Sequence, residues 1–124
     1  MKKDIQNRND LMQLVQSFYE KLLADSSIAY LFTDVAKISL EHHLPVLVDF
    51  WEGILFQTGN YHNNTLQPHL DLHAKSPLLE SHFKTWLNYF NATVDELFEG
   101  EKAFMAKERA LSIATVMRIK LIQG

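Results

Sequence analysis

Apolar residues recur at helical spacing along most of the chain. Two neighbouring apolar stripes between positions 11 and 23 follow the 3.6-residue period and predict a first helix over residues 11–23. Asn9 or Asp10 is suited to cap its start, because short polar side chains accept the unpaired amides of a first turn. The polar run 25–27 ends the pattern, and a short helical turn over residues 28–32 is expected to stop at the polar residues that follow.

The middle of the chain predicts a second long helix over residues 41–57, with His43 and Leu47 on one face. Pro45 has no amide hydrogen and is comfortable only in a first turn, where that donor would be unpaired anyway. We therefore expect the regular helix to begin near His42, or to kink at Pro45.

A short segment, residues 65–73, follows a loop rich in glycine and asparagine and is expected to form a single short helix. His69 and His73 are four residues apart and share one face of it. Spacing alone favours a surface or capping role for His69. A zinc clamp by the pair is a weaker alternative, because the segment lacks the glutamate of the His-Glu-x-x-His motif and a nearby third ligand.

Two further helices are predicted in the last third of the chain. Ser76-Pro77 is typical of a helix start, and the helix is expected to run from Leu78 to about Phe90. Residues 93–96 have the pattern of a capping box, which predicts a last helix reaching about Leu121. Its expected inward-facing residues are Leu97, Phe104, Ala110, Leu111, Ala114 and either Met117 or Val116. With only four glycines and three prolines, the chain predicts an all-α fold.

Composition narrows the class of protein. The 124 residues are expected to form one domain, residues 1–124. A net charge of -3 without a basic cluster argues against a nucleic-acid partner. The absence of cysteine excludes disulfides, thiolate metal sites and covalent haem attachment, and is compatible with a reducing compartment. The N-terminus lacks the apolar run of a secretory signal, and no segment approaches the roughly 18 apolar residues of a membrane span. We expect a cytoplasmic protein, a monomer or a weak dimer.

Three polar side-chain tips lie on or beside the apolar stripes of three predicted helices: Tyr19, His43 and Trp86. A buried hydroxyl, imidazole or indole N–H without a partner costs about 1–3 kcal/mol. Each residue taken singly fits an isolated core position bonded to a nearby carbonyl. Together they indicate a shared polar spot inside an apolar cavity, where a ligand would fit. The other histidines outside the short segment, His42, His62 and His82, are expected to face solvent.

Several segments, in this order and spacing, resemble the truncated haemoglobins, and specifically their group III branch, over nearly the whole chain. They are LVQSFYEKL (14–22), HLPVLVDFW (43–51), PHLDLH (68–73), HFKTWL (82–87) and TVDELF (93–98). No single segment is specific, but their order and spacing together are. The absence of the glycine-glycine motifs of other truncated haemoglobins also fits this branch.

The resemblance implies a shortened globin, a sandwich of two helices over two, around a non-covalent haem b. His69 matches the proximal iron ligand of the family. Tyr19, His43 and Trp86 match its distal-pocket positions, the same three residues that burial had singled out.

The resemblance also implies residues that contact the haem itself. Phe32 matches the phenylalanine that packs on the haem plane, and Leu47 matches the apolar residue one turn beyond the distal histidine. The segment after His73 varies in length within the family, so the partners of the haem edge are less defined. Candidates there are Tyr61, His73 and Lys75.

The implied function is reversible binding of O₂, and of NO, CO or cyanide, with Tyr19 and Trp86 as hydrogen-bond donors. His43 is expected to donate as well or to act as a gate. The alternative is a redox enzyme, converting NO and O₂ to nitrate or reacting with peroxide, which would need a separate reductase because the chain has no flavin or NAD motif. A third hypothesis is a helical interaction domain without a cofactor.

Overall fold

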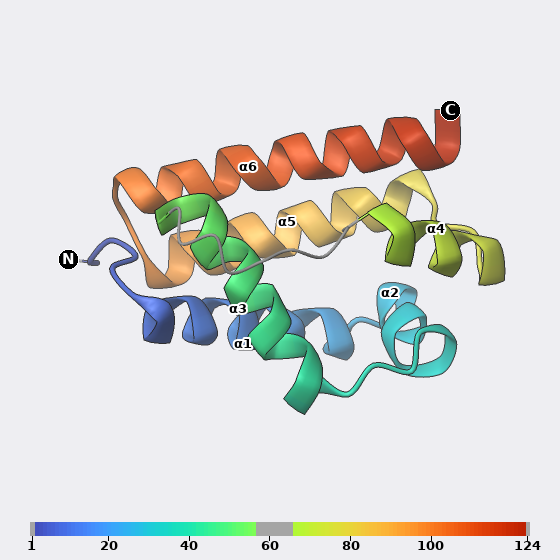
Figure 1. Ribbon diagram of the computed structural model, residues 1–124, viewed down its shortest axis with the longest axis horizontal. Coiled ribbons are helices and arrows are strands. Elements are labelled where there is room, and N and C mark those ends of the chain that lie inside the picture. The colour runs from blue at the N-terminus through green and yellow to red at the C-terminus, as the bar shows by residue number, and fades with distance from the viewer. Residues whose placement is uncertain (1, 57–65, 124) are drawn as a thin grey trace.

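The computed structural model describes residues 2–56 and 66–123, except for the side chains of residues 66–68 and 122–123. Over these residues it contains six α-helices, two short π-helical turns and no strand (Figure 1). The helices are α1 (Arg8–Ala24), α2 (Ser26–Tyr30), α3 (Leu40–Phe56), α4 (Leu66–Lys75), α5 (Glu80–Leu97) and α6 (Glu101–Arg118), and the π-helical turns are η1 (Leu31–Val35) and η2 (Ile119–Gln123). The predicted all-α fold is confirmed.

The long helices form two pairs. α5 and α6 run antiparallel along one side of the molecule, α1 lies on the other side of α5, and α3 crosses in front of α1 (Figure 1). This is the two-over-two arrangement expected from the sequence. The shorter elements α2, η1 and α4 gather at one end of the pairs, where α4 contacts η1. No helix in residues 2–56 and 66–123 has both the length and the apolar character needed to cross a membrane.

The core lies where the two pairs meet. Its fully buried side chains include Leu11, Leu14 and Leu22 of α1, Val48 and Leu55 of α3, and Phe90 and Val94 of α5. Burying a side chain of this size contributes about 1.5–3 kcal/mol. Phe90 stacks between two tryptophans, with ring centroids 4.8 Å from Trp51 and 5.8 Å from Trp86. The stacking of Trp86 on the buried ring of Phe90 therefore holds the indole in place.

Helix α1 begins at Arg8, about one helical turn before the predicted start at residue 11. Its cap is Asn7, whose side chain accepts the amide of Asp10 at 3.0 Å, so a cap at Asn9 or Asp10 is wrong. Asp10 instead lies within the first turn, and its side chain connects this turn to the residues before the helix. Its carboxylate accepts the amide of Gln6 at 2.9 Å and pairs with the ammonium of Lys3 at 2.8 Å.

The helical turn after α1 extends beyond the predicted residues 28–32 on both sides. The Asp25 carboxylate caps its start by accepting the Ser27 amide at 2.9 Å. The π-helical turn η1 carries the chain past the expected stop at Thr33 as far as Val35.

Helix α3 spans Leu40–Phe56, which agrees with the predicted residues 41–57 to within one residue, although it begins before His42. The amides of His42 and His43 both bond to the carbonyl of Ser39, at 3.1 and 2.8 Å, and this closes a turn ahead of the proline. Pro45 thus lies inside the helix, where it cannot supply an amide to the turn before it.

The boundary between the last two helices is also displaced from its predicted place. α5 begins at Glu80 and continues through Thr93 to Leu97, so the predicted end near Phe90 and the capping box at 93–96 are wrong. Thr93 is fully buried, and its hydroxyl donates to the carbonyl of Tyr89 at 2.7 Å within the same helix. A threonine in this role cannot cap a following helix.

The actual cap of α6 comes from the N-terminal arm. The carboxylate of Asp4 accepts the amides of Lys102 and Ala103, each at 2.9 Å, and that of Ile5 at 2.8 Å. Burial alone would raise the pKa of Asp4, but these amides and the charge of Lys102 outweigh it and hold the pKa below its usual value. Gly100 precedes the helix with a φ of +146°.

The inward face of α6 differs from the predicted one. Ala110, Ala114 and Met117 are buried as expected, together with Ala103 and Ala106. Phe104 and Leu111, predicted to face inward, are 62% and 49% exposed; of the two alternatives near the end of the helix, Met117 is the buried one and Val116 is 48% exposed. The prediction failed because it gave weight to large apolar side chains, whereas α6 is buried through small ones.

We expect Gly100→Ala to lower the free energy of unfolding by about 1–3 kcal/mol, since its backbone conformation is essentially restricted to glycine. A Cβ at this position would also lie 2.5 Å from the Cγ of Asp4 and would displace the α6 cap. Urea unfolding followed by circular dichroism measures the change. The matched control is Gly53→Ala inside α3, where a Cβ meets nothing within 4 Å. This control should gain about 0.5–1 kcal/mol; equal effects of the two substitutions would contradict the prediction.

Candidate functional site

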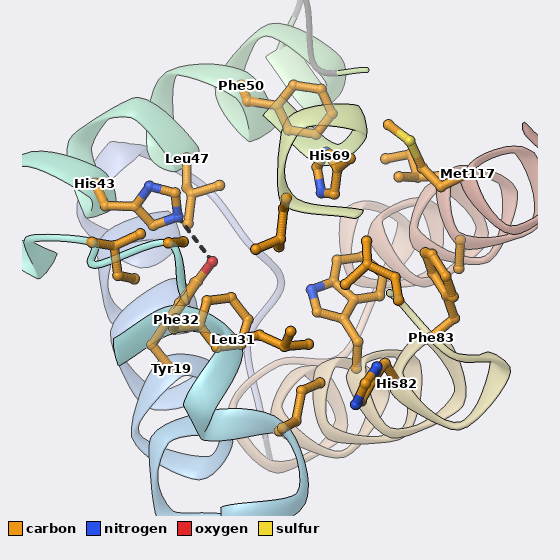
Figure 2. A pocket seen from close by; sticks show the side chains of 18 of the residues that line it. Tyr19, Leu31, Phe32, His43, Leu47, Phe50, His69, His82, Phe83 and Met117 are labelled. Atoms are coloured by element: carbon orange, nitrogen blue, oxygen red, sulfur yellow. Dashed lines mark hydrogen bonds between the residues drawn. The ribbon is translucent and has the colours of Figure 1, made fainter. Parts of the chain in front are cut away.

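A cavity of about 270 Å³ lies at the end of the molecule where the short helices gather, and all six helices contribute to its wall (Figure 2). Most of the wall is apolar and aromatic. It includes Leu31, Phe32, Leu47, Phe50, Phe83, Trp86, Ile113 and Met117. Besides the tryptophan indole, four side chains contribute polar groups: Tyr19, His43, His69 and His82.

Six of the residues predicted from the sequence line this one cavity. They are Tyr19 of α1, Phe32 of η1, His43 and Leu47 of α3, His69 of α4 and Trp86 of α5. His73 and Lys75 are not among the described residues that line it, and Tyr61 lies outside the described residues. The structure thus brings the first six together, while their roles toward a ligand stay predictions.

Tyr19 and His43 form the polar centre of the cavity. The hydroxyl oxygen of Tyr19 lies 3.0 Å from Nε2 of His43, and Tyr19 is only 4% exposed (Figure 2). Burial raises the pKa of the Tyr19 hydroxyl. Burial also lowers the pKa of the His43 imidazole, and the charge of His69 lowers it further. Both groups are therefore neutral at neutral pH.

The tautomer of His43 determines what Tyr19 can offer to a ligand. With the His43 proton on Nδ1, Nε2 accepts the tyrosine hydroxyl hydrogen, which is then occupied. With the proton on Nε2, the imidazole donates to the tyrosine oxygen, and the hydroxyl hydrogen is available to a third group. The pair is satisfied in either state.

His69 enters the cavity from α4, on a different side from Tyr19 and His43 (Figure 2). The imidazoles of His69 and His43 line the same cavity. His69 lies on α4, which spans Leu66–Lys75 and confirms the single short helix predicted for residues 65–73.

His73, the other histidine of α4, serves the turn that follows the helix. Its Nδ1 accepts the amide of Leu78 at 2.9 Å. This bond joins the end of α4 to the segment that leads into α5. Within the part of the chain that the structure describes, no group of three His, Cys, Asp or Glu side chains is arranged to hold a metal ion.

The prediction that His82 faces solvent is wrong. His82 is 7% exposed, and its Nδ1 accepts the amide of Leu79 at 3.0 Å. Since that nitrogen accepts, the proton of the neutral ring is on Nε2, which lies 3.1 Å from the hydroxyl of Tyr30 and donates to it. His82 occupies the third position of α5 and does there what glutamate or glutamine does in a capping box. This was the signal available in the sequence.

His82 should make the stability of the protein depend on pH. Burial lowers the pKa of its imidazole, and the backbone of Ser27 offsets only part of that shift. The unfolded chain takes up this proton below about pH 6.5, whereas the folded chain does so only at lower pH. Stability should therefore fall on acidification, by at most about 1.4 kcal/mol per pH unit from this group.

Chemical unfolding between pH 7.5 and 5.5 measures this dependence. His82→Gln, which keeps an acceptor for the Leu79 amide but does not titrate, should reduce the slope. His42→Gln on the exposed side of α3 is the matched control and should leave it unchanged. An identical slope in wild type and His82→Gln would contradict the assignment.

Comparison with known proteins gives two matches to one kind of protein, although no protein-family model matches the chain. The chain is 29% identical over 118 residues to the group 3 truncated hemoglobin ctb of Campylobacter jejuni, covering 93% of this chain and 91% of that protein. The crystal structure of the group III truncated hemoglobin from Campylobacter jejuni matches the fold with a TM-score of 0.87 at 26% identity, covering 100% of this chain and 98% of that one. The resemblance predicted from the sequence is confirmed.

Proposed function

We propose, from the premise that this chain is a truncated globin by sequence and by fold, that it binds haem b through His69 and reversibly binds O₂. One observation carries the proposal. His69 enters a largely apolar cavity from α4, on a different side from the Tyr19–His43 pair, and the indole of Trp86 lines the same cavity.

The residues that line the cavity fit a haem. The aromatic and aliphatic walls, including Phe32 and Phe83, suit the faces of a porphyrin, and His69 offers one imidazole. Haem iron held by one imidazole has a sixth position open to a diatomic ligand such as O₂, NO, CO or cyanide.

The other polar groups would then meet the diatomic ligand. The indole of Trp86 has an N–H donor and no acceptor, so it can only donate. Tyr19 donates when the proton of His43 is on Nε2. Donation to a ligand that carries partial negative charge is worth roughly 1.5–3 kcal/mol. A site with such donors would release O₂ slowly and would be poorly suited to rapid O₂ delivery.

The test of haem binding is the absorption spectrum. Wild-type protein mixed with haem should give a strong Soret band with one haem per chain, and His69→Ala should lose it or bind haem at least about tenfold more weakly. His42→Ala on the surface of α3 is the matched control and should behave as wild type. Normal haem affinity in His69→Ala, or no Soret band in the wild type, would reject the proposal.

The test of the distal donors is the rate of O₂ dissociation, measured by stopped-flow displacement with CO. Tyr19→Phe and Trp86→Phe should each speed dissociation about tenfold, since about 1.4 kcal/mol corresponds to one decade. Because Tyr19 contacts His43, the effect of Tyr19→Phe should change by more than about 0.5 kcal/mol in a His43→Leu background. Tyr89→Phe, which removes a hydroxyl that bonds to Asp25 outside the cavity lining, is the control. Unchanged rates in both donor variants would assign these residues to packing.

A second candidate is redox chemistry of NO or peroxide in the same cavity. The observation that favours it is that three side chains able to form hydrogen bonds, Tyr19, His43 and Trp86, line the same largely apolar cavity. Either reaction would require a separate reductase to restore ferrous iron. Turnover with NO and a reductant separates this candidate from simple O₂ binding.

A further inference from the structure

Over its described side chains, helix α4, which carries His69, buries little apolar surface. Side chains of α1, α3, α5 and α6 reach the core, whereas none of the α4 side chains from His69 to Lys75 is buried. The element that α4 contacts most is the short turn η1. Since packing of an apolar face supplies most of the stability of a helix in a protein, the position of α4 must depend on a few specific contacts.

Two histidines accept consecutive backbone amides in the corner between α4 and α5. Nδ1 of His73, near the end of α4, accepts the amide of Leu78 at 2.9 Å. Nδ1 of His82, in the first turn of α5, accepts the amide of Leu79 at 3.0 Å. Both amides lie between the two helices, where no helical carbonyl accepts them, so each imidazole satisfies a donor that would otherwise cost free energy.

His82 connects this corner to a third element. Its Nε2 donates to the hydroxyl of Tyr30, at the end of α2, at 3.1 Å. α2 leads directly into η1, and η1 contacts α4. The two histidines thus complete a ring of contacts that runs from α4 through the corner and α5 to α2 and η1, and back to α4, at one end of the molecule (Figure 1). Each part of the ring lines the cavity, through Leu72, Leu78, His82, Ile28 and Leu31.

We propose that His73 is a positioning residue for His69, a role that rests on the proposed function of His69 as the haem ligand. His73 lies one helical turn beyond His69 on α4, and its bond to Leu78 fixes the end of that helix to the corner. Without this bond little burial would hold α4, and His69 would move with the helix. A metal ligand depends on such supporting contacts for its position.

The rate of haem loss from the haem-loaded chain, measured by transfer to excess apomyoglobin, tests the proposal. His73→Leu removes the acceptor of the Leu78 amide and should speed haem loss about tenfold. His73→Asn keeps an acceptor oxygen at the same distance along the side chain as Nδ1 of histidine, and its rate should stay within about threefold of the wild type. His42→Leu, at an exposed position of α3, is the matched control and should not change the rate.

The order of the two His73 variants separates positioning from an effect on helix stability. Leucine favours a helix more than asparagine does, so an effect on the helix alone would make His73→Asn the poorer variant. Positioning predicts the reverse order. The iron–histidine stretching band of the ferrous protein in resonance Raman spectra should shift or broaden in His73→Leu and match the wild type in His73→Asn.

Haem with both propionate groups esterified separates positioning from a direct contact between His73 and the haem. The ratio of the His73→Leu and wild-type rates should be the same for esterified and free haem, because the bond to Leu78 does not involve the haem. A ratio that falls to one with esterified haem would show that His73 binds the haem carboxylates, and would overturn the proposal. Wild-type rates in His73→Leu, or equally fast loss in His73→Asn, would overturn it too. His69→Ala tests the proposed function separately, because it removes the ligand itself.

Discussion

The packing of α6 through small side chains is the constraint on which much of this structure depends. Ala106 and Ala110 are fully buried, so α6 can lie close to its neighbours in the sandwich. This close approach sets Ala114 and Met117 into the wall of the cavity. It also turns the larger apolar residues of α6 toward solvent. One choice of side-chain size thus shapes both the inner cavity and the outer surface.

The core in turn prepares the polar wall of the cavity. Phe90 is fully buried and contacts rings from three helices, including Phe18 of α1 at 5.3 Å between centroids. Because its ring is stacked on that of Trp86, the indole is held in place by core packing and does not depend on a ligand for its position. A donor positioned in advance avoids the entropy of ordering when a ligand arrives. The cavity wall is therefore continuous with the core.

The helices were predictable from periodicity, but their ends were not. α4 and the body of α1 follow the apolar pattern closely. The errors came where a side chain has two possible roles. Thr93 reads as a cap, yet buried within α5 it bonds back to Tyr89, and the cap of α6 comes from Asp4, nearly a hundred residues away in sequence. Contacts between distant positions decide such cases, and no local pattern contains them.

The candidate site shows the same division between local and distant information. Burial arguments identified Tyr19, His43 and Trp86 as unusual, and the family resemblance was needed to join them to His69. The burial of His82 was missed because its contact with Tyr30 forms only in the folded chain; its place in the first turn of α5, within reach of the Leu79 amide, was the one local signal.

In the proposed ligand site, the bond between Tyr19 and His43 would link ligand binding to the state of one proton. A buried hydroxyl and imidazole left unpaired would each cost free energy, and at 3.0 Å they satisfy one another before any ligand is present. A ligand that accepts from Tyr19 must therefore find His43 protonated on Nε2, or break the bond. Either change costs free energy. The net free energy that Tyr19 contributes to binding is therefore smaller than that of its hydrogen bond to the ligand. Within the part of the chain that the structure describes, no such hydrogen bond occupies the indole N–H of Trp86. This donor should therefore contribute the steadier part of the interaction. The affinity of the site is then governed as much by His43, which need not touch the ligand, as by the residues that do.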